Sequence, residues 1–351
     1  MTEENQTPHK RRVRYSGKYP KKFEEKYKEL QPEKYKDTIE HVIKKGNTPA
    51  GMHISIMVNE ILDFLKIQPG ETGFDATLGY GGHTKAMLQC LKGQGHIYAT
   101  DVDPEESART RKRLEEAGFG EDILTIRLQN FCTIDEIAKE AGGFDFILAD
   151  LGVSSMQIDN PKRGFSFKVD GPLDLRLNQE AGISAAERLA AITKDELAGM
   201  LYENSDEPYC EELAKAITDE IRKGNRIDTT TKLRNIIEKT LDFLPEKEKK
   251  DTIKKTCQRT FQALRIDVNR EFEVLYEFME KLPDALKPGG RAAILTFHSG
   301  EDKLVKKALK EGYRAGIYAD YAKDVIRPSA QECAQNGRAR STKMRWAVKA
   351  E

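Results

Sequence analysis

The feature that most constrains this chain is a repeated alternation between short apolar runs and longer charged stretches over residues 73–149. The runs lack the polar alternation of a half-exposed strand, which is typical of strands buried on both faces, and they cover 73–76, 96–100, 123–128 and 144–149. Charged stretches with helical spacing separate most of them. This order predicts a parallel sheet with right-handed helical crossovers, and so an α/β fold.

The alternation is interrupted between residues 158 and 260, where helical patterns follow one another without a convincing strand. We predict helices there over 184–192, 194–202, 211–223 and 231–241. The sheet pattern then resumes with one helix carrying apolar residues from Phe261 to Leu282, a strand over 291–297 and a last helix through 304–309. We therefore predict a basic N-terminal extension (1–48), a first domain part (49–160), an inserted helical domain (161–258) and a second domain part (259–351).

Composition sets limits on partners and compartment. The 351 residues include 58 Lys+Arg and 58 Asp+Glu, so no global field would draw the chain to a polyanion, and an RNA surface must come from local asymmetry. The five cysteines are scattered and never form Cys-x-x-Cys, which argues against a disulfide framework and a zinc site. No signal-peptide core or membrane-spanning run is visible, so we expect a cytoplasmic protein without a membrane partner.

Two segments carry a local excess of positive charge. Residues 1–48 hold 13 Lys/Arg against 8 Asp/Glu, with Tyr and Lys interleaved, as in either a solvated arm or an RNA ligand. The basic residues of 326–350 face a single acid, Glu332. This C-terminal segment is either a solvated tail or a contact for RNA phosphates.

The loop after the first predicted strand is rich in glycine. It contains Gly79, Gly81 and Gly82 before Thr84, and glycine allows a backbone to turn tightly and approach a ligand. The third glycine of the dinucleotide fingerprint is missing and no Gly-Lys-Ser/Thr follows, which disfavours a nicotinamide site and a P-loop. An ordinary strand-to-helix turn is the alternative to a nucleoside site.

Three later strand ends face the same crevice in an open parallel sheet. The second strand ends at Asp101, whose carboxylate is suited to ribose hydroxyls, and the third is followed by Phe131, which is placed to lie against adenine. The fourth ends at Asp150. Each residue alone has a structural alternative, as core or helix cap, but the set in register predicts an adenosine-containing cofactor.

Longer motifs then point to a family. The segments that carry the resemblance are 150–159, 163–167, 171–176, 259–265, 268–269, 288–291, 297–299, 301–302 and 338–341. They closely resemble the MraW-type family of small-subunit ribosomal RNA cytosine-N4 methyltransferases, from about His53 to Ala347.

The resemblance implies a class I S-adenosylmethionine-dependent methyltransferase sheet with a helical domain inserted after the fourth strand, acting on the N4 amine of a cytidine in the small ribosomal subunit. No metal is required. By motif position, the family's contacts with the cofactor S-adenosylmethionine fall on Gly81, Gly82, His83, Asp101, Phe131, Asp150 and Gln157.

The sequence departs from the family pattern at Lys255 to Gln258, at Gly300 and at Gly337. Together with the basic extension, these changes indicate a divergent member or paralogue. Three alternatives therefore accompany the methyltransferase interpretation: action on another RNA position or substrate, a non-catalytic RNA-binding assembly factor, and a nucleotide-dependent oxidoreductase. Both a monomer and a homodimer remain open.

Methyl transfer from a sulfonium is an in-line displacement, so the acceptor atom must be held near the methyl carbon. Asp150 is our candidate for the group that acts on the exocyclic amine, with service to the cofactor's amino-acid part as the alternative. Phe165 and Phe167 are candidates for base stacking or for core packing, and His298 for orienting the base or for a structural role. The predicted RNA contacts are Arg259, Arg265, Arg338, Arg340 and Lys343.

Overall fold

The computed structural model describes residues 55–351, so the predictions made for residues 1–48 lie outside the described residues. Seven strands form one sheet in the order β3-β2-β1-β4-β5-β7-β6. Their bounds are Thr72–Asp75 (β1), His96–Asp101 (β2), Leu124–Leu128 (β3), Phe144–Asp150 (β4), Leu286–Thr296 (β5), Tyr318–Tyr321 (β6) and Lys343–Lys349 (β7). The pairs among β1 to β5 are parallel, whereas β7 is antiparallel to both β5 and β6. This is the strand order of a class I methyltransferase, which confirms the predicted fold class.

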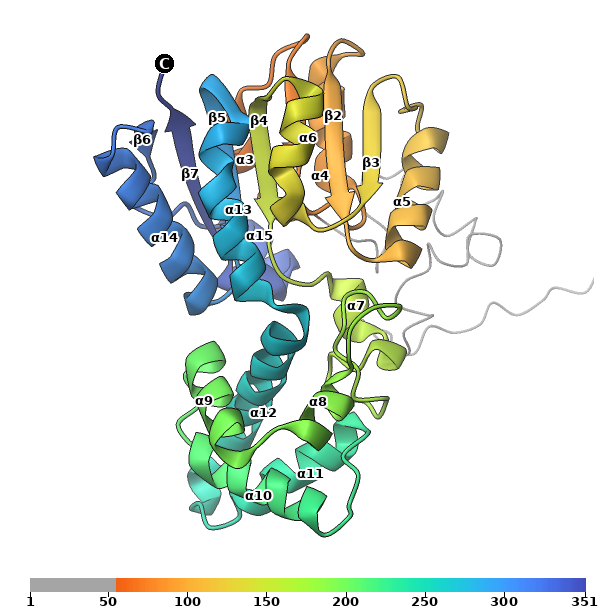
Figure 1. The fold of residues 1–351 in the computed structure, drawn as a ribbon, viewed down its shortest axis with the longest axis vertical. Helices are drawn as coiled ribbons and strands as arrows, with labels where there is room; N and C mark the ends of the chain where they lie inside the picture. The colour runs from red at the N-terminus through yellow and green to blue at the C-terminus, as the bar shows by residue number, and fades with distance from the viewer. Residues whose placement is uncertain (1–54) are drawn as a thin grey trace, which may run out of the picture. The chain divides into compact units, whose positions relative to one another are not determined.

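Helices cover both faces of the sheet because its central strands are apolar on both faces (Figure 1). In β4, Phe146 and Leu148 pack toward α3 (Val58–Leu65), α4 (Gly82–Leu91) and α5 (Pro104–Glu116). Ile147 and Ala149 pack toward α6 (Ile134–Ala141), α13 (Glu271–Ala285) and α14 (Ser299–Arg314). The alternation of side chains along one strand thus supplies both halves of the core.

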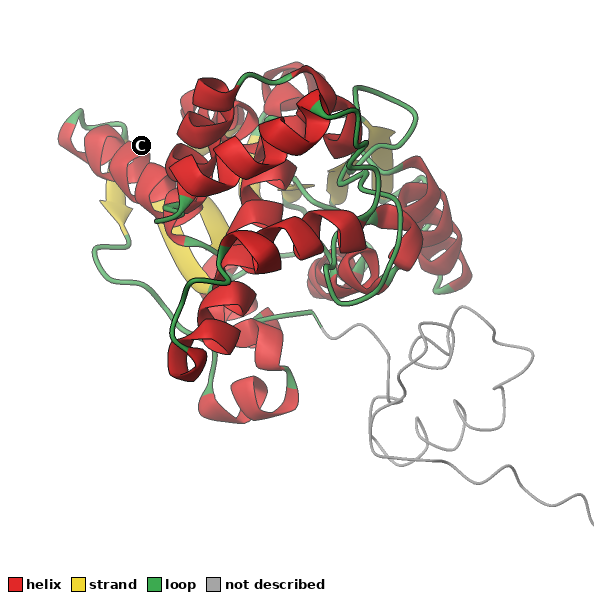
Figure 2. Cartoon of the chain, turned by 90° about the horizontal axis from the view of Figure 1, so that it is seen from below, coloured by secondary structure: helices red, strands yellow, loops and turns green. Residues whose placement is uncertain are grey.

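The predicted helical insertion follows β4 and has an apolar core of its own. Its helices are α7 (Ser155–Asp159), α8 (Ala185–Ala191), α9 (Lys194–Ser205), α10 (Cys210–Arg222), α11 (Thr230–Thr240) and α12 (Glu246–Asn269). Figure 2 shows them packed as a group of helices. Since α12 continues without a break through residue 258, the boundaries 161–258 stay a prediction.

The single helix predicted to carry Phe261 to Leu282 is wrong. The structure has two helices, α12 and α13, that meet at Arg270, whose φ of 51° is left-handed. The apolar residues of α12 belong to the insertion's core, whereas those of α13 belong to the sheet's core. One straight helix would not serve two separate cores, and the turn at Arg270 redirects the chain.

The prediction that the last ordered element is a helix is also wrong, because β6 and β7 follow α14. Strand β7 mixes buried and partly exposed residues, and its basic side chains made the segment look like a charged tail. One of them, Arg345, is only 4% exposed and is neutralised by Asp302, with 2.6 Å between Nε and Oδ1. The remaining short elements are η2 (Phe131–Thr133), η3 (Pro161–Arg163), α15 (Ala330–Gln335) and η4 (Gly337–Ser341). Within residues 55–351, no helix combines the length and apolarity that crossing a bilayer requires.

Candidate active site

A cavity of about 370 Å³ lies at the carboxyl ends of the parallel strands, where ligands bind in open α/β sheets. Residues of the loops after β1, β2, β3 and β4 line it, together with residues of α12, α13 and η4. All seven residues predicted to contact the cofactor line this cavity: Gly81, Gly82, His83, Asp101, Phe131, Asp150 and Gln157. The structure therefore brings together residues that are up to 76 positions apart in the sequence.

The glycine loop after β1 is shaped by its close neighbours. Gly81 has a φ of 80° directly before α4, and a Cβ there would lie 2.6 Å from Cγ2 of Thr110. The amide of Gly79 donates to Oδ2 of Asp101 at 2.8 Å. Glycine is required at position 81 by backbone conformation and by space, and the loop is fixed to the end of β2.

Asp101 has the features of a ribose-binding carboxylate. Oδ1 accepts from the amide of Asp103 and Oδ2 from that of Gly79, both at 2.8 Å, which orients the carboxyl group. Burial nevertheless raises its pKa from 3.8 to about 6. Each oxygen accepts more than one hydrogen bond, so both keep capacity for a ligand hydroxyl.

Asp150 lines the cavity, and one of its carboxylate oxygens lacks a hydrogen-bond partner among the described residues. Its amide donates to Oγ1 of Thr77, while its Oδ1 is buried without a hydrogen-bond partner in the described part of the chain. Desolvation raises its pKa from 3.8 to about 6, opposed by His83 and reinforced by the neighbouring carboxylates. A buried acceptor without a partner is uncommon in proteins, so Asp150 is a candidate for contact with a ligand.

His83 lies against Asp150 and is held in place by a backbone carbonyl. Nε2 of His83 is 2.8 Å from the carbonyl oxygen of Ile56, so that nitrogen carries the hydrogen in the assigned tautomer. Nδ1 then faces Oδ2 of Asp150 at 3.5 Å. An attractive contact between Nδ1 and Oδ2 requires a proton on one of the two groups.

Gln157 and Phe131 complete the cofactor side. Gln157 forms a capping box with Ser154 at the start of α7, and its Nε2 donates to Oδ2 of Asp103 at 3.1 Å. Phe131 meets the ring of Phe278 edge-on, with centroids 5.2 Å apart. Both side chains are held by neighbours that do not depend on a ligand, so this side of the cavity is preformed.

The opposite wall is built around an ion pair. Nε and Nη2 of Arg265 donate to the two carboxylate oxygens of Glu271 at 2.8 and 2.9 Å. Glu301 accepts from the amide of Phe297 at 2.8 Å. Burial would raise the pKa of Glu301, but His298, the Phe297 amide and Arg265 together hold it below its usual value. This wall therefore offers ionised groups that are already oriented.

His298 lies behind this wall and is not among the residues that line the cavity. Its Nε2 is 3.2 Å from Oε1 of Glu301, and its ring contacts that of Phe272. Potential metal-ligating atoms of Glu271, His298 and Glu301 lie within 4.8 Å of one another. Arg265 compensates Glu271, so the two carboxylates already have cationic or hydrogen-bonding partners.

The two predicted base-stacking residues are not brought to the cavity. Phe165 is 8% exposed and belongs to the core of the insertion, and Phe167 packs edge-on against Phe261 with centroids 5.7 Å apart. Their placement favours the packing alternative. Conversely, the sequence reasoning assigned no role to Asn269 and Glu301, which line the cavity. Both lie in motifs that carry the family resemblance, so the resemblance was the sequence signal that could have identified them.

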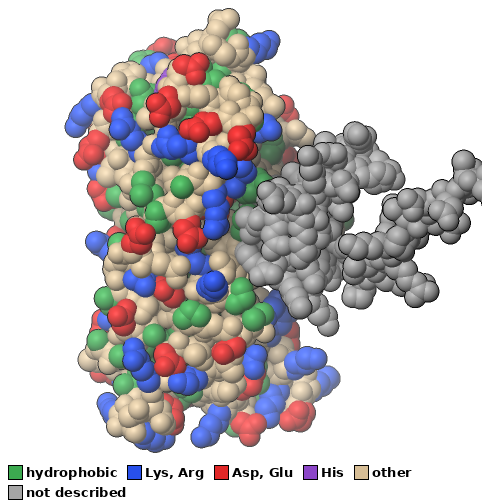
Figure 3. Space-filling view, turned by 90° about the vertical axis from the view of Figure 1, so that its right-hand side faces the viewer, with side chains coloured by type: hydrophobic (Ala, Val, Ile, Leu, Met, Phe, Trp, Pro, Cys, Tyr) green, Lys and Arg blue, Asp and Glu red, His purple; other side chains and the backbone are tan. Residues whose placement is uncertain are grey.

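The residues predicted to contact RNA differ in whether a nearby carboxylate already neutralises their charge. Arg265 is paired with Glu271. Nη2 of Arg338 lies 2.7 Å from Oδ1 of Asp159, and Nζ of Lys343 lies 2.7 Å from Oδ2 of Asp302. Arg259 is half-buried on α12, and Arg340 is exposed on η4. Figure 3 shows basic and acidic side chains interspersed over one face of the molecule, in keeping with such local pairing.

The strand order, the glycine loop after β1 and the acid at the end of β2 together define a class I S-adenosylmethionine-dependent methyltransferase. The model of the MraW methylase family matches residues 50–350. The chain belongs to this family. The matched region begins after the basic N-terminal segment of residues 1–48.

Named relatives are similar over nearly the full length. The chain is 87% identical to "Ribosomal RNA small subunit methyltransferase H 1" of Agathobacter rectalis over 100% of both chains. It is 70% identical to the protein of the same name from Lachnoclostridium phytofermentans, over 99% of this chain and 95% of the relative. Among solved structures, an S-adenosylmethionine-dependent O-methyltransferase from Thermotoga maritima aligns with 86% of this chain and 68% of its own, at 12% identity and a TM-score of 0.39.

Proposed function

We propose that this protein transfers the methyl group of S-adenosylmethionine to the exocyclic N4 amine of a cytidine in the RNA of the small ribosomal subunit. The observation that carries the proposal is the carboxylate of Asp150 at the carboxyl end of β4, which lines the same cavity as the predicted cofactor residues and has one oxygen without a hydrogen-bond partner in the described part of the chain. The names of the relatives and the family resemblance supply the class of RNA and the amine.

The residues present fit the cofactor. Asp101 has two oriented oxygens for the ribose hydroxyls, Phe131 lies beside the place for adenine, and the backbone at Gly81 and Gly82 allows close approach. When bound, S-adenosylmethionine supplies an electrophilic methyl carbon. What remains for the protein is to hold the acceptor amine in line with that carbon and to exclude water.

Asp150 is suited to work on a poorly nucleophilic amine. The N4 lone pair is delocalised into the cytosine ring, and a hydrogen bond from N4–H to Oδ1 favours the pyramidal nitrogen that the displacement needs. With a pKa of about 6, Asp150 is ionised at neutral pH and is a stronger base than an ordinary aspartate. The proton that the methylated nitrogen loses passes to this carboxylate.

The wall formed by Arg265, Asn269 and Glu301 is where we place the base. These groups offer donors and acceptors in the cavity that Asp150 also lines. We assign the RNA phosphates chiefly to Arg340, which is exposed. Arg338 and Lys343 contribute less because each is paired with a carboxylate, and Arg259 contributes less because its charge already acts on the carboxylate of Glu207.

The test uses small ribosomal subunits from cells that lack this gene. Subunits are incubated with the full-length protein and methyl-labelled S-adenosylmethionine, and the RNA is digested and analysed by nucleoside mass spectrometry with the site mapped. We expect one labelled N4-methylcytidine per subunit. Label on another nucleotide would refute the assignment of the base. If the protein binds the cofactor and the small subunit but no nucleotide becomes labelled, the result favours the non-catalytic assembly factor.

A further inference from the structure

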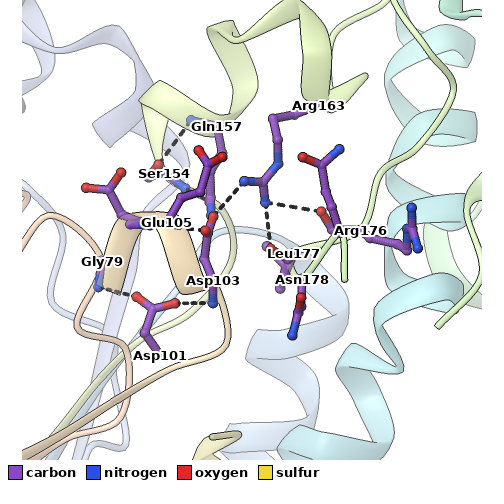
Figure 4. A network of polar contacts seen from close by, with 12 residues as sticks. Gly79, Asp101, Asp103, Glu105, Ser154, Gln157, Arg163, Arg176, Leu177 and Asn178 are labelled. Atoms are coloured by element: carbon purple, nitrogen blue, oxygen red, sulfur yellow. Dashed lines mark hydrogen bonds and ion pairs between the residues drawn. The ribbon is translucent and has the colours of Figure 1, made fainter. Parts of the chain in front are cut away.

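A buried ion pair joins the loop after β2 to the helical insertion (Figure 4). Nη1 of Arg163 lies 2.7 Å from Oδ2 of Asp103, and the two side chains are only 8% and 3% exposed. Asp103 lies two residues after Asp101, the last residue of β2, whereas Arg163 ends η3, 60 residues later. A pair so deeply buried is costly to desolvate, so a role beyond stability is worth seeking.

On the cofactor side, Asp103 makes several contacts. Its amide donates to Oδ1 of Asp101 at 2.8 Å, and its own Oδ1 caps α5 by accepting from the amide of Glu106 at 3.1 Å. Oδ2, which holds Arg163, also accepts from Nε2 of Gln157 at 3.1 Å. The position of Asp103 is therefore tied to two residues predicted to contact the cofactor, Asp101 and Gln157.

On the insertion side, the same guanidinium holds a loop. Nη2 of Arg163 donates to the carbonyl oxygens of Leu177 at 2.6 Å and Arg176 at 3.2 Å. The amide of Leu177 in turn donates to Oδ1 of Asn269 at 2.7 Å, and Nδ2 of Asn269 donates to the carbonyl of Leu175 at 2.8 Å. Leu177 and Asn269 line the cavity on the side where we place the base.

We propose that Arg163 is a positioning residue that couples occupancy of the cofactor site to the order of the 175–178 loop and so to the wall of the acceptor site. Ribose hydroxyls on Asp101 fix residues 101–103, and the guanidinium of Arg163 passes that constraint to the loop. The planar fork of arginine spans one carboxylate and two carbonyls at once, which the point charge of lysine does not do. The inference rests on the proposed role of Asp101 and is independent of which base is methylated.

Hydrogen–deuterium exchange of the full-length protein, with and without saturating S-adenosylmethionine, tests the coupling. In the wild type, the cofactor slows exchange both in the glycine loop, residues 79–82, and in the 175–178 loop. We expect the slowing in the 175–178 loop to be about fivefold or more, the lower range of measured couplings between sites. Protection of 79–82 alone in the wild type would overturn the proposal.

Two variants and one control separate coupling from simple damage. Arg163→Lys keeps the charge, and the double variant Asp103→Asn with Arg163→Met removes both charges while Asn still caps α5. Both are expected to keep the protection of 79–82 and to lose that of 175–178. Arg188→Met removes a comparable arginine that pairs with Asp267 and Glu196 away from the cavity, and it should behave as wild type.

Undisturbed exchange in β4 shows that a variant is folded. If a folded double variant still gains cofactor protection over 175–178, Arg163 is a structural residue only and the proposal fails. Failure of the cofactor assignment gives a different result. In that case Asp101→Ala leaves the affinity for S-adenosylmethionine unchanged, independently of the Arg163 variants.

Discussion

The pH dependence of turnover offers a direct test of Asp150. Burial raises its pKa to about 6, and only the ionised carboxylate accepts a hydrogen bond from the amine and then its proton. Activity should therefore rise with pH through about 6. Between pH 5 and pH 7 the ionised fraction increases by about tenfold, and kcat should increase by the same factor.

The confounding group is Asp101, whose pKa is also raised to about 6 by burial. The two titrations separate kinetically, because Asp101 acts on cofactor binding and Asp150 on the reaction. With S-adenosylmethionine far above its KM at every pH, protonation of Asp101 is overcome by mass action, and kcat reports groups in the bound complex. The assay is multiple-turnover methylation of small subunits at saturating concentrations of both substrates from pH 5 to pH 8.5.

The matched variant is Asp150→Asn, which keeps the shape of the side chain but has no group that titrates near pH 6. It should lower kcat by about 100-fold or more, in the range of general acid–base effects, and the remaining rate should not rise through pH 6. A wild-type profile that is flat from pH 5 to pH 7 would refute the reasoning. So would an Asp150→Asn enzyme with wild-type turnover and a weakened cofactor complex, which would assign Asp150 to the cofactor alone.

Four further outcomes follow from the same contacts. Asp101→Ala should weaken S-adenosylmethionine binding by about tenfold to 100-fold, because charge-assisted hydrogen bonds are worth about 1.5–3 kcal/mol, and calorimetry on the folded variant measures it. Asp150→Asn should melt at a higher temperature than wild type at pH 8. The pKa of Asp150 in the folded protein, about 6, lies above the ordinary 3.8, so ionisation of Asp150 destabilises the folded wild type as pH rises through 6, by up to about 3 kcal/mol. This gain should vanish near pH 4. Arg340→Glu should flatten the logarithmic salt dependence of RNA binding by about 0.7 at constant melting temperature. Arg338→Glu should instead lower the melting temperature, since it places a second negative charge beside Asp159.

Local sequence patterns predicted the elements better than the contacts between them. The strand ends at Asp101 and Asp150 were predictable because parallel strands buried on both faces read as apolar runs and their carboxyl ends meet at one edge. The turn at Arg270 was not, because an arginine with positive φ leaves no mark in the sequence. Strand β7 was hidden for a similar reason, since Arg345 looks solvated until Asp302 is found beside it.

The C-terminal segment shows why charge counts alone misjudge an RNA surface. A chain with zero net charge needs local asymmetry to attract a polyanion, and residues 326–350 supply it in sequence. In the folded protein, acids from distant segments neutralise Arg338, Lys343 and Arg345. These ion pairs hold the segment to its own domain and leave less positive charge for RNA. Each such contact would have to break before a phosphate replaced it, whereas Arg340 is exposed and meets no such cost. The affinity for RNA should therefore reside in a few unpaired cations around the cavity, and specificity in the cavity wall, where Arg265 and Glu301 are already fixed before a base arrives.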